Sequence, residues 1–191
     1  YPHIDVSALN PADPKDNYLM EHFTAYIYKM EEPILVEPLY GWVIPESFRV
    51  FRKSFSYIDD PWDKAKRKPS ALQFLLPHKT VELDSCISIR YNWSNYYHFL
   101  IDTLNQVHLA EGKVPTNVPL LVPYFFPQLK HVADFMKESD FLKGRKIIVQ
   151  QKNEYYKVKN LYICKDTFYS DSIFSVVRSF GDVVNKDNGQ N

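Results

Sequence analysis

The chain has 191 residues, of which 45% are hydrophobic, 16% aromatic and 24% charged, a composition typical of a globular domain rather than a disordered or fibrous chain. Twenty-three basic residues balance twenty-three acidic ones, so the strong net positive charge of most nucleic-acid-binding proteins is absent. No apolar run reaches the roughly 18–20 residues of a membrane-spanning helix.

The first 80 residues predict an extended arm followed by short strands. Residues 1–20 are polar and contain three prolines, which is typical of an arm. Residues 21–80 contain runs rich in Tyr, Phe, Val and Ile that alternate with further prolines. Because proline cannot occupy a central strand, we expect a β-rich subdomain of short antiparallel or edge strands.

From residue 81 the hydrophobic period alternates between two and 3.6 residues, which predicts strands followed by helices. We expect strands at 86–91, 118–124, 146–150 and 157–165, and helices at about 94–112, 126–139 and 170–184. Gly112 is a suitable residue to end the first helix. The apolar face of that helix is predicted to comprise Tyr97, Leu100, Ile101, Leu104 and His108. We therefore predict an α/β lobe over residues 81–184, with a mostly parallel, Rossmann-like sheet covered by helices on both faces.

The two cysteines and the few glycines exclude several common functions. Cys86 and Cys164 lack the spacing of a zinc site, and we expect two small buried side chains in strands, with one structural disulfide as the alternative. No GxGxxG, GxxxxGK[ST] or GxSxG motif is present, so the usual dinucleotide-binding, phosphate-binding and hydrolase signatures are absent.

The segment from Asn92 to Asp102 is the strongest candidate for a functional site. It lies where a predicted strand leads into a helix, and open α/β sheets bind ligands at the carboxyl ends of their strands. His98 and Asp102 are four residues apart and can touch on a helix. The positive helix end would keep His98 neutral and able to accept a proton, with Asp102 orienting its ring. Alternatively, the two residues form an ordinary helix pair.

Other residues carry weaker signals. Asn95, His98, Asp102 and Asn105 would share one polar stripe of the helix. His108 is predicted to lie in the core and His131 on a surface helix. No paired carboxylates or His/Cys cluster predict a metal site. A basic run at 64–68 could bind phosphate but is more simply a solvated loop. The chain's thirty aromatic residues could stack on sugars, although most fall in strand patterns.

The stretch from Asn95 to Leu104, NYYHFLIDTL, resembles the N-Y-Y-H-[FW]-L-x-[DE]-x-L signature of glycosyltransferase family 61. The proline that usually follows this signature is Asn105 here. Three later stretches are similar to the family's next strand, helix and strand, and to the helix that leads to its second lobe. The resemblance covers roughly residues 80–184, and its specific part is NYYHFLID.

The resemblance implies the acceptor-side lobe of a two-lobe, GT-B type glycosyltransferase acting in glycan or polysaccharide biosynthesis. It implies an inverting, metal-independent enzyme that uses a nucleotide-sugar donor and no cofactor. His98 would be the catalytic base or position the acceptor, and Asp102 would orient it. Asn92, Asn95 and Tyr97 are the candidates for binding substrate. Residues 185–191 would lead to a second lobe that holds most of the donor, so this chain alone would be inactive.

Two other hypotheses remain, a non-catalytic α/β domain that binds carbohydrate or protein, and an unrelated hydrolase using His98 and Asp102. The expected partners are a glycan acceptor and the nucleotide-sugar donor, with no nucleic acid. A homodimer could form through the lobe face that normally meets the second lobe. The free cysteines and the lack of a signal peptide predict the cytoplasm or the cytoplasmic face of a membrane. The secretory lumen is the alternative for a eukaryotic protein.

Overall fold

The computed structural model describes residues 12, 26–38, 41–44, 79–89, 96, 99–138 and 144–165. The strands are β1 (Tyr26–Met30), β2 (Ile34–Val36), β3 (Val43–Ile44), β4 (Lys79–Ser88), β5 (Leu120–Val122), β6 (Ile147–Val149) and β7 (Glu154–Lys165). The helices are the π-helix η3 (Phe99–Thr103), α5 (Leu104–Ala110), the 3-10 helix η4 (Phe126–Gln128) and α6 (Lys130–Glu138). The predicted α/β class is confirmed. The predicted helix at 170–184, the linker at 185–191 and, apart from Ala12, the arm lie outside the described residues.

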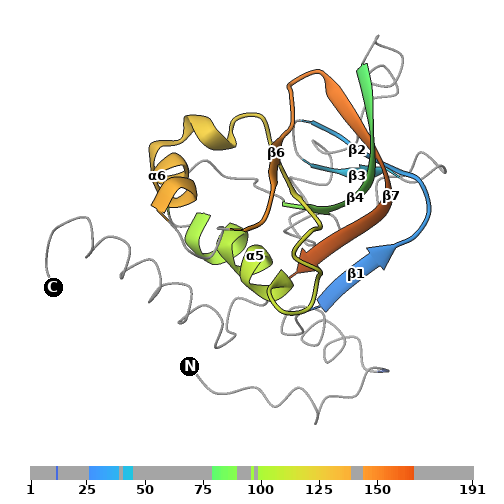
Figure 1. The fold of residues 1–191 in the computed structure, drawn as a ribbon, viewed down its shortest axis with the longest axis horizontal. Helices are drawn as coiled ribbons and strands as arrows, with labels where there is room; N and C mark the ends of the chain where they lie inside the picture. Colours follow the sequence, from blue (N-terminus) through green and yellow to red (C-terminus); the bar gives the residue numbers. More distant parts are fainter. Residues whose placement is uncertain are drawn as a thin grey trace, which may run out of the picture.

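All seven described strands belong to one mixed sheet (Figure 1). Its order is β3-β2-β7-β4-β5-β6, and β1 also pairs with β7. The pairings β4–β5, β4–β7 and β5–β6 are parallel, whereas β1–β7, β2–β7 and β2–β3 are antiparallel. Parallel and antiparallel pairings are therefore equal in number among the described strands.

The parallel strands follow the order β6-β5-β4-β7. In chain order, β4, β5 and β6 step in one direction, and β7 then returns to the other side of β4. The strand order therefore reverses between β4 and β7, which is the kind of point where open α/β sheets bind ligands. When successive β-α-β connections have the same handedness and each adds the next strand on the same side, their helices lie on the same face of the sheet. Both α5 and α6 pack on the same face of this sheet.

The short strands β1, β2 and β3 confirm the prediction of antiparallel strands in this region. One edge of β7 pairs with β2 over its first half, where Val36 lies opposite Tyr156, and with β1 over its second half, where Met30 lies opposite Leu161. The other edge of β7 pairs with β4 in parallel. The described strands β1, β2 and β3 thus extend the sheet of β4–β7.

The sheet curls so that its two ends meet. Only four residues separate β6 from β7. Nevertheless, β7 begins beside the amino end of β4, whereas β5 pairs with its carboxyl end. At this connection the side-chain amide of Gln150 donates to the backbone oxygens of Val36 and Glu154, both at 3.1 Å. β6 and β2 are therefore neighbours in space, and the long strand β4 follows a strongly curved path (Figure 1).

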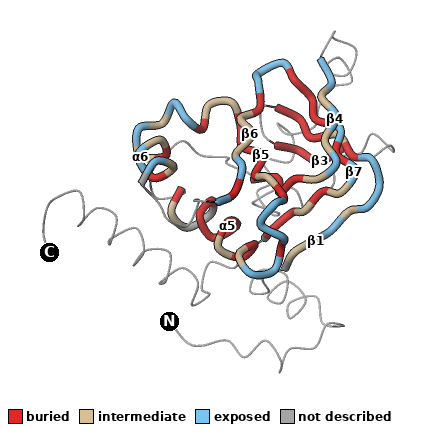
Figure 2. Tube along the Cα trace, in the orientation of Figure 1, coloured by how far each residue is buried: buried red, intermediate tan, exposed pale blue. Residues whose placement is uncertain are grey.

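The curled sheet has a separate hydrophobic core on each face. In β5, Leu120 and Val122 point to the helix-covered core, and Leu121 between them points to the core enclosed by strands β1, β2, β3 and β7. This alternation is the period of two that the sequence shows in strands. The buried residues of both cores line the sheet in Figure 2. Helices α5 and α6 cover one face of the sheet, and the other core is enclosed by described strands; helices on both faces stay a prediction, because residues 170–184 lie outside the described ranges.

The predicted apolar face of the first helix is confirmed at Leu104 and Leu100, although the helix contains a π turn at Phe99–Thr103. Phe99, Leu104 and Val107 are buried, whereas Leu100 and His108 are only half-buried. A π turn closes with i→i+5 hydrogen bonds and so holds one more residue than an α turn. The extra residue brings Phe99 into the core in addition to Leu100, which packs against it. Gly112 does end the helix, with φ +69, as predicted.

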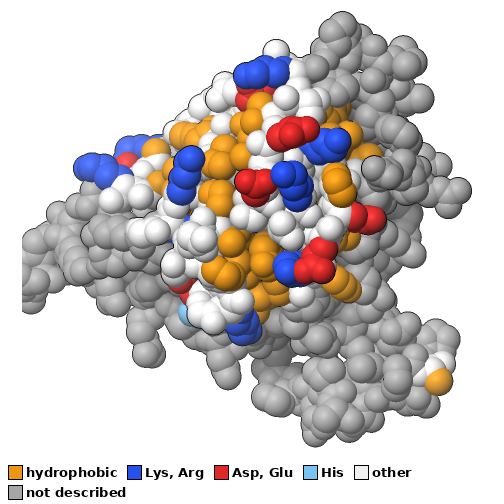
Figure 3. All heavy atoms as spheres, turned by 45° about the vertical axis from the view of Figure 1, so that its right-hand side comes forward, with side chains coloured by type: hydrophobic (Ala, Val, Ile, Leu, Met, Phe, Trp, Pro, Cys, Tyr) orange, Lys and Arg blue, Asp and Glu red, His pale blue; other side chains and the backbone are white. Residues whose placement is uncertain are grey.

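Charged side chains of both signs alternate on the outer surface of the strands in Figure 3. Lys159 forms an ion pair with Asp84 at 2.9 Å across β7 and β4, and Lys29 pairs with Glu31 after β1. Exposed pairs of this kind are worth up to about 1 kcal/mol each and mainly keep the surface hydrated. None of the described helices combines the length and the apolar character needed to cross a membrane.

Candidate functional site

The structure describes little of the predicted site itself. Asn92, Asn95, Tyr97 and His98 lie outside the described residues. Asp102 belongs to the π-helix, and its backbone is described but its side chain is not. Their proposed contacts therefore stay predictions.

The position of the segment that carries them follows from the described elements on either side. β4 ends at Ser88, and η3 begins at Phe99 on the helix-covered face. The intervening segment therefore leaves the carboxyl end of β4, one of the two strands between which the strand order reverses. π-Helical turns are rare and are often found at functional sites. The carboxyl end of β4 is accordingly the candidate site.

An aromatic cluster connects this end of the strand to the core. The Tyr96 side chain is 44% exposed, and its ring lies 5.6 Å from the His131 ring at an interplanar angle of 86°. His131 in turn lies 5.3 Å from the ring of Phe99, which is fully buried. Phe99 also makes edge-to-face contacts with Phe126 and Phe135. A continuous set of ring contacts thus runs from the exposed Tyr96 through His131 to the buried rings around Phe99.

The electrostatic environment keeps both Tyr96 and His131 uncharged. Burial lowers the pKa of His131 from 6.5, although the negative charge of Asp134 acts in the opposite direction. Burial raises the pKa of the Tyr96 hydroxyl above its ordinary value. The carboxylate of Asp134 also accepts a hydrogen bond from Lys130 at 2.7 Å. At neutral pH the imidazole of His131 can therefore accept a hydrogen bond from a neutral donor such as a hydroxyl.

The sequence alone does not identify this role for His131. It was expected on a surface helix, but the structure places its ring between Tyr96 and Phe99. A partial signal exists, because His131 and the buried Phe135 are four residues apart and share a side of α6. The contact with Tyr96 joins two helices that follow different strands, so the residue pattern within one helix does not predict it.

Of the predicted polar stripe, only the side chain of Asn105 is described. It is fully buried, and the neighbouring Gln106 is 3% exposed. The π turn accounts for the difference, because it changes the angular relation between Asp102, which precedes α5, and residues within α5. Asn105 therefore belongs to the interior of the fold and not to the candidate site.

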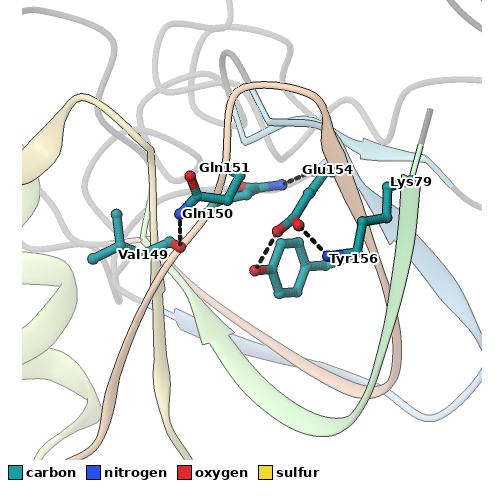
Figure 4. A network of polar contacts seen from close by, with 6 residues as sticks. All are labelled: Lys79, Val149, Gln150, Gln151, Glu154 and Tyr156. Carbon is teal, nitrogen blue, oxygen red and sulfur yellow. Dashed lines mark hydrogen bonds and ion pairs between the residues drawn. The ribbon is translucent and has the colours of Figure 1, made fainter. Parts of the chain in front are cut away.

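A second polar cluster lies at the opposite end of β4 and β7 (Figure 4). The Glu154 carboxylate accepts a hydrogen bond from Lys79 at 2.6 Å and another from the Tyr156 hydroxyl at 3.2 Å. The hydrogen bond from Lys79 is the main reason why the pKa of Glu154 is lowered. Burial, reinforced by Glu154, raises the pKa of Tyr156 to about 12. Because its described groups hydrogen-bond to one another, this cluster joins the starts of the two strands.

Neither cysteine has the environment of a reactive group. Cys86 and Cys164 are both fully buried and free, which confirms the expectation of small buried side chains and excludes the alternative disulfide. Burial raises the pKa of the Cys86 thiol to about 12, so its nucleophilic thiolate is scarce at neutral pH. Among the described residues, no group of three or more His, Cys, Asp or Glu side chains is arranged to hold a metal ion.

Comparisons with known proteins do not identify relatives of this chain. No family model matches it, and neither the curated proteins nor the solved structures contain a match.

Proposed function

We propose that this chain forms the acceptor-side lobe of an inverting, metal-independent glycosyltransferase of the GT-B type. The observation that supports this function is the position of the NYYHFLID segment. Its last four residues, 99–102, belong to the π-helix η3, which is the next described element after Tyr96 along the chain from the carboxyl end of β4. The family resemblance of that segment supplies the reaction class.

In the proposed reaction, the acceptor hydroxyl oxygen attacks the anomeric carbon of the donor sugar as the bond to the nucleotide breaks. His98 accepts the hydroxyl proton, and Asp102 orients the imidazole and stabilises its positive charge. Attack opposite the leaving group inverts the anomeric centre. Asn92, Asn95 and Tyr97 bind substrate beside it. A second lobe, reached through residues 185–191, holds most of the nucleotide.

The first experiment compares nucleotide-sugar binding by this chain and by a longer parent protein that contains the second lobe. Isothermal titration with uridine and guanosine diphosphate sugars measures it. We expect binding by the parent protein only, because the donor site lies mainly in the second lobe. Binding by neither protein would contradict the proposal and favour a non-catalytic carbohydrate- or protein-binding domain.

The second experiment tests the catalytic residues in the parent protein. Loss of a general base typically costs about 10²–10⁴-fold in rate, so we expect a fall of this order for His98→Ala. Asp102→Asn should give a smaller fall. His108→Gln is the control, because His108 lies in the adjoining helix α5 and is only half-buried. Transfer at the unchanged rate by a correctly folded His98→Ala variant would refute the assigned role.

A further inference from the structure

The hydroxyl group of Thr103 is buried in an unfavourable environment. Thr103 is the last residue of the π-helix η3 and directly precedes α5. It is 0% exposed, and within the described part of the chain its hydroxyl oxygen has no hydrogen-bond partner. The hydroxyl does not cap α5, because Thr103 already has helical dihedral angles, with φ −86 and ψ −52. Since an unsatisfied buried hydroxyl is costly, the π turn carries a local energetic penalty.

The geometry of the π turn explains why this hydroxyl lacks a partner. In an α-helix, a threonine hydroxyl can donate to the carbonyl oxygen four residues earlier, which for Thr103 is that of Phe99. A π turn instead joins residues five apart, so it holds one extra residue and moves that carbonyl away from the Thr103 side chain. An α-helical turn at the same place would allow the hydrogen bond.

The core beside the π turn can accommodate either kind of turn. Phe99 is fully buried, and the next residue, Leu100, packs against the same core. In an α-helix, Leu100 would lie one turn before Leu104 and take the position that Phe99 now holds. An apolar cavity of about 10 Å³ borders Phe99, Thr103 and Leu104. Because protein cores are otherwise close-packed, this cavity leaves space for a small rearrangement.

We propose that the helix formed by η3 and α5 switches between two registers, the observed π turn and a less populated α turn in which the Thr103 hydroxyl donates to the Phe99 carbonyl oxygen. A shift of one residue rotates the first turn of the helix by about 100° and moves it by about 1.5 Å relative to α5. Asp102 lies in that turn, so the switch repositions a residue of the proposed catalytic pair. The switch itself is a property of this chain and does not depend on the proposed function.

Relaxation-dispersion NMR of this chain tests the switch, because helix register shifts occur on the microsecond-to-millisecond timescale. We expect exchange at the backbone amides and methyl groups of Leu104 and Val107, with a minor state populated at about 0.1–10%. Thr103→Val keeps the shape of the side chain but removes the hydroxyl. The minor state then loses its hydrogen bond, so its population should fall by about two- to tenfold.

Thermal unfolding of the same variant examines the major state. Thr103→Val removes the unsatisfied hydroxyl from the π turn, so the unfolding midpoint should rise by about 2–8 °C. Thr103→Ser keeps the hydroxyl, so the exchange should persist. Thr116→Val is the matched control, because Thr116 is exposed in the loop between α5 and β5. It should leave the exchange unchanged and shift the midpoint by less than about 2 °C.

Three outcomes would each refute the switch. They are flat dispersion profiles along α5, an unchanged minor-state population in Thr103→Val, and a lower unfolding midpoint for Thr103→Val, which would show that the hydroxyl has a partner in the major state. The proposed function is judged separately. If the chain exchanges as expected but the parent protein transfers no sugar, the transferase activity is refuted and the switch stands.

Discussion

Arg145 should be a major determinant of stability, although no sequence motif marks it. Its side chain is buried and donates hydrogen bonds to three backbone oxygens of the loop between α5 and β5. The bond lengths are 2.7 Å to Pro115, 2.9 Å to Val118 and 3.1 Å to Val114. The guanidinium also lies 3.4 Å from the carboxylate of Glu111. One side chain therefore joins three carbonyl groups of this loop, in addition to the loop's backbone hydrogen bonds.

The variant Arg145→Met preserves most of the volume but removes the guanidinium donor from the carbonyl oxygens of Val114 and Val118, whereas that of Pro115 still accepts from the backbone N–H of Val118. A hydrogen bond to a charged group contributes roughly 1.5–3 kcal/mol, and an unsatisfied buried polar group costs about 1–3 kcal/mol. Because the three bonds share one side chain and part of the loop can hydrate, we expect a total loss of about 3–5 kcal/mol. Domains are stabilised by about 5–15 kcal/mol, so this is a large fraction.

Urea unfolding followed by circular dichroism measures the loss. With a slope of about 2 kcal/mol per molar urea, the midpoint should fall by about 1.5–2.5 M. Arg145→Lys should lie in between, because a single ammonium group cannot reach all three oxygens. The adjacent Lys146 is exposed, so Lys146→Met is the matched control and should change stability by less than about 0.5 kcal/mol. Equal midpoints for Arg145→Met and Lys146→Met would refute the reasoning.

Three further predictions follow from the described contacts. The buried thiols of Cys86 and Cys164 should resist alkylation by iodoacetamide at pH 8 in the native chain and react after denaturation, as followed by mass spectrometry; rapid labelling of the native chain would contradict this. Because the pKa of Glu154 is lowered from 4.5, its ion pair contributes stability above about pH 4.5 that is lost as the pH falls through the lowered folded-state value. Glu154→Gln should flatten the dependence of the urea midpoint on pH between 5 and 3, and an unchanged acid profile would contradict the assignment. Gly112→Ala should lower stability by about 1–2 kcal/mol. The cost is conformational, because φ of Gly112 is +69 and an added Cβ would meet no atom within 4 Å. Thermal unfolding measures the loss, and an unchanged midpoint would show that the helix end relaxes.

The local pattern of side chains was enough to predict most elements of the second half of the chain. Runs of apolar and β-branched residues correctly located β5, β6 and β7, and the helical period located α6. Gly112 ends its helix, and both cysteines are buried in strands. These features are set by interactions between residues close in sequence, or by the simple need to bury an apolar face. A reader of the sequence can therefore recover them without knowing which elements touch.

The candidate site could be predicted only in part. The strand-to-helix segment after β4 is a local signal, and the sequence was sufficient to select it. The π turn between Phe99 and Thr103 gives no such local signal, because its residues also fit an α-helical period. It nevertheless changes which residues face the core. The contact between Tyr96 and His131 joins helices that follow β4 and β5, so it exists only after those strands have paired.

The tertiary structure alone decided how the sheet closes. Gln150 binds the backbone of Val36, 114 residues earlier, and Lys79 binds Glu154 across 75 residues. Such contacts depend on the position of β7 between β2 and β4. The alternation of apolar and polar side chains along a strand indicates which face is buried, but not which strand lies beside it. The sequence by itself therefore determined the positions of β5, β6, β7 and α6 and the alternation of buried side chains in the strands. The order of the strands, the curl of the sheet and the partners of its polar side chains required the folded chain.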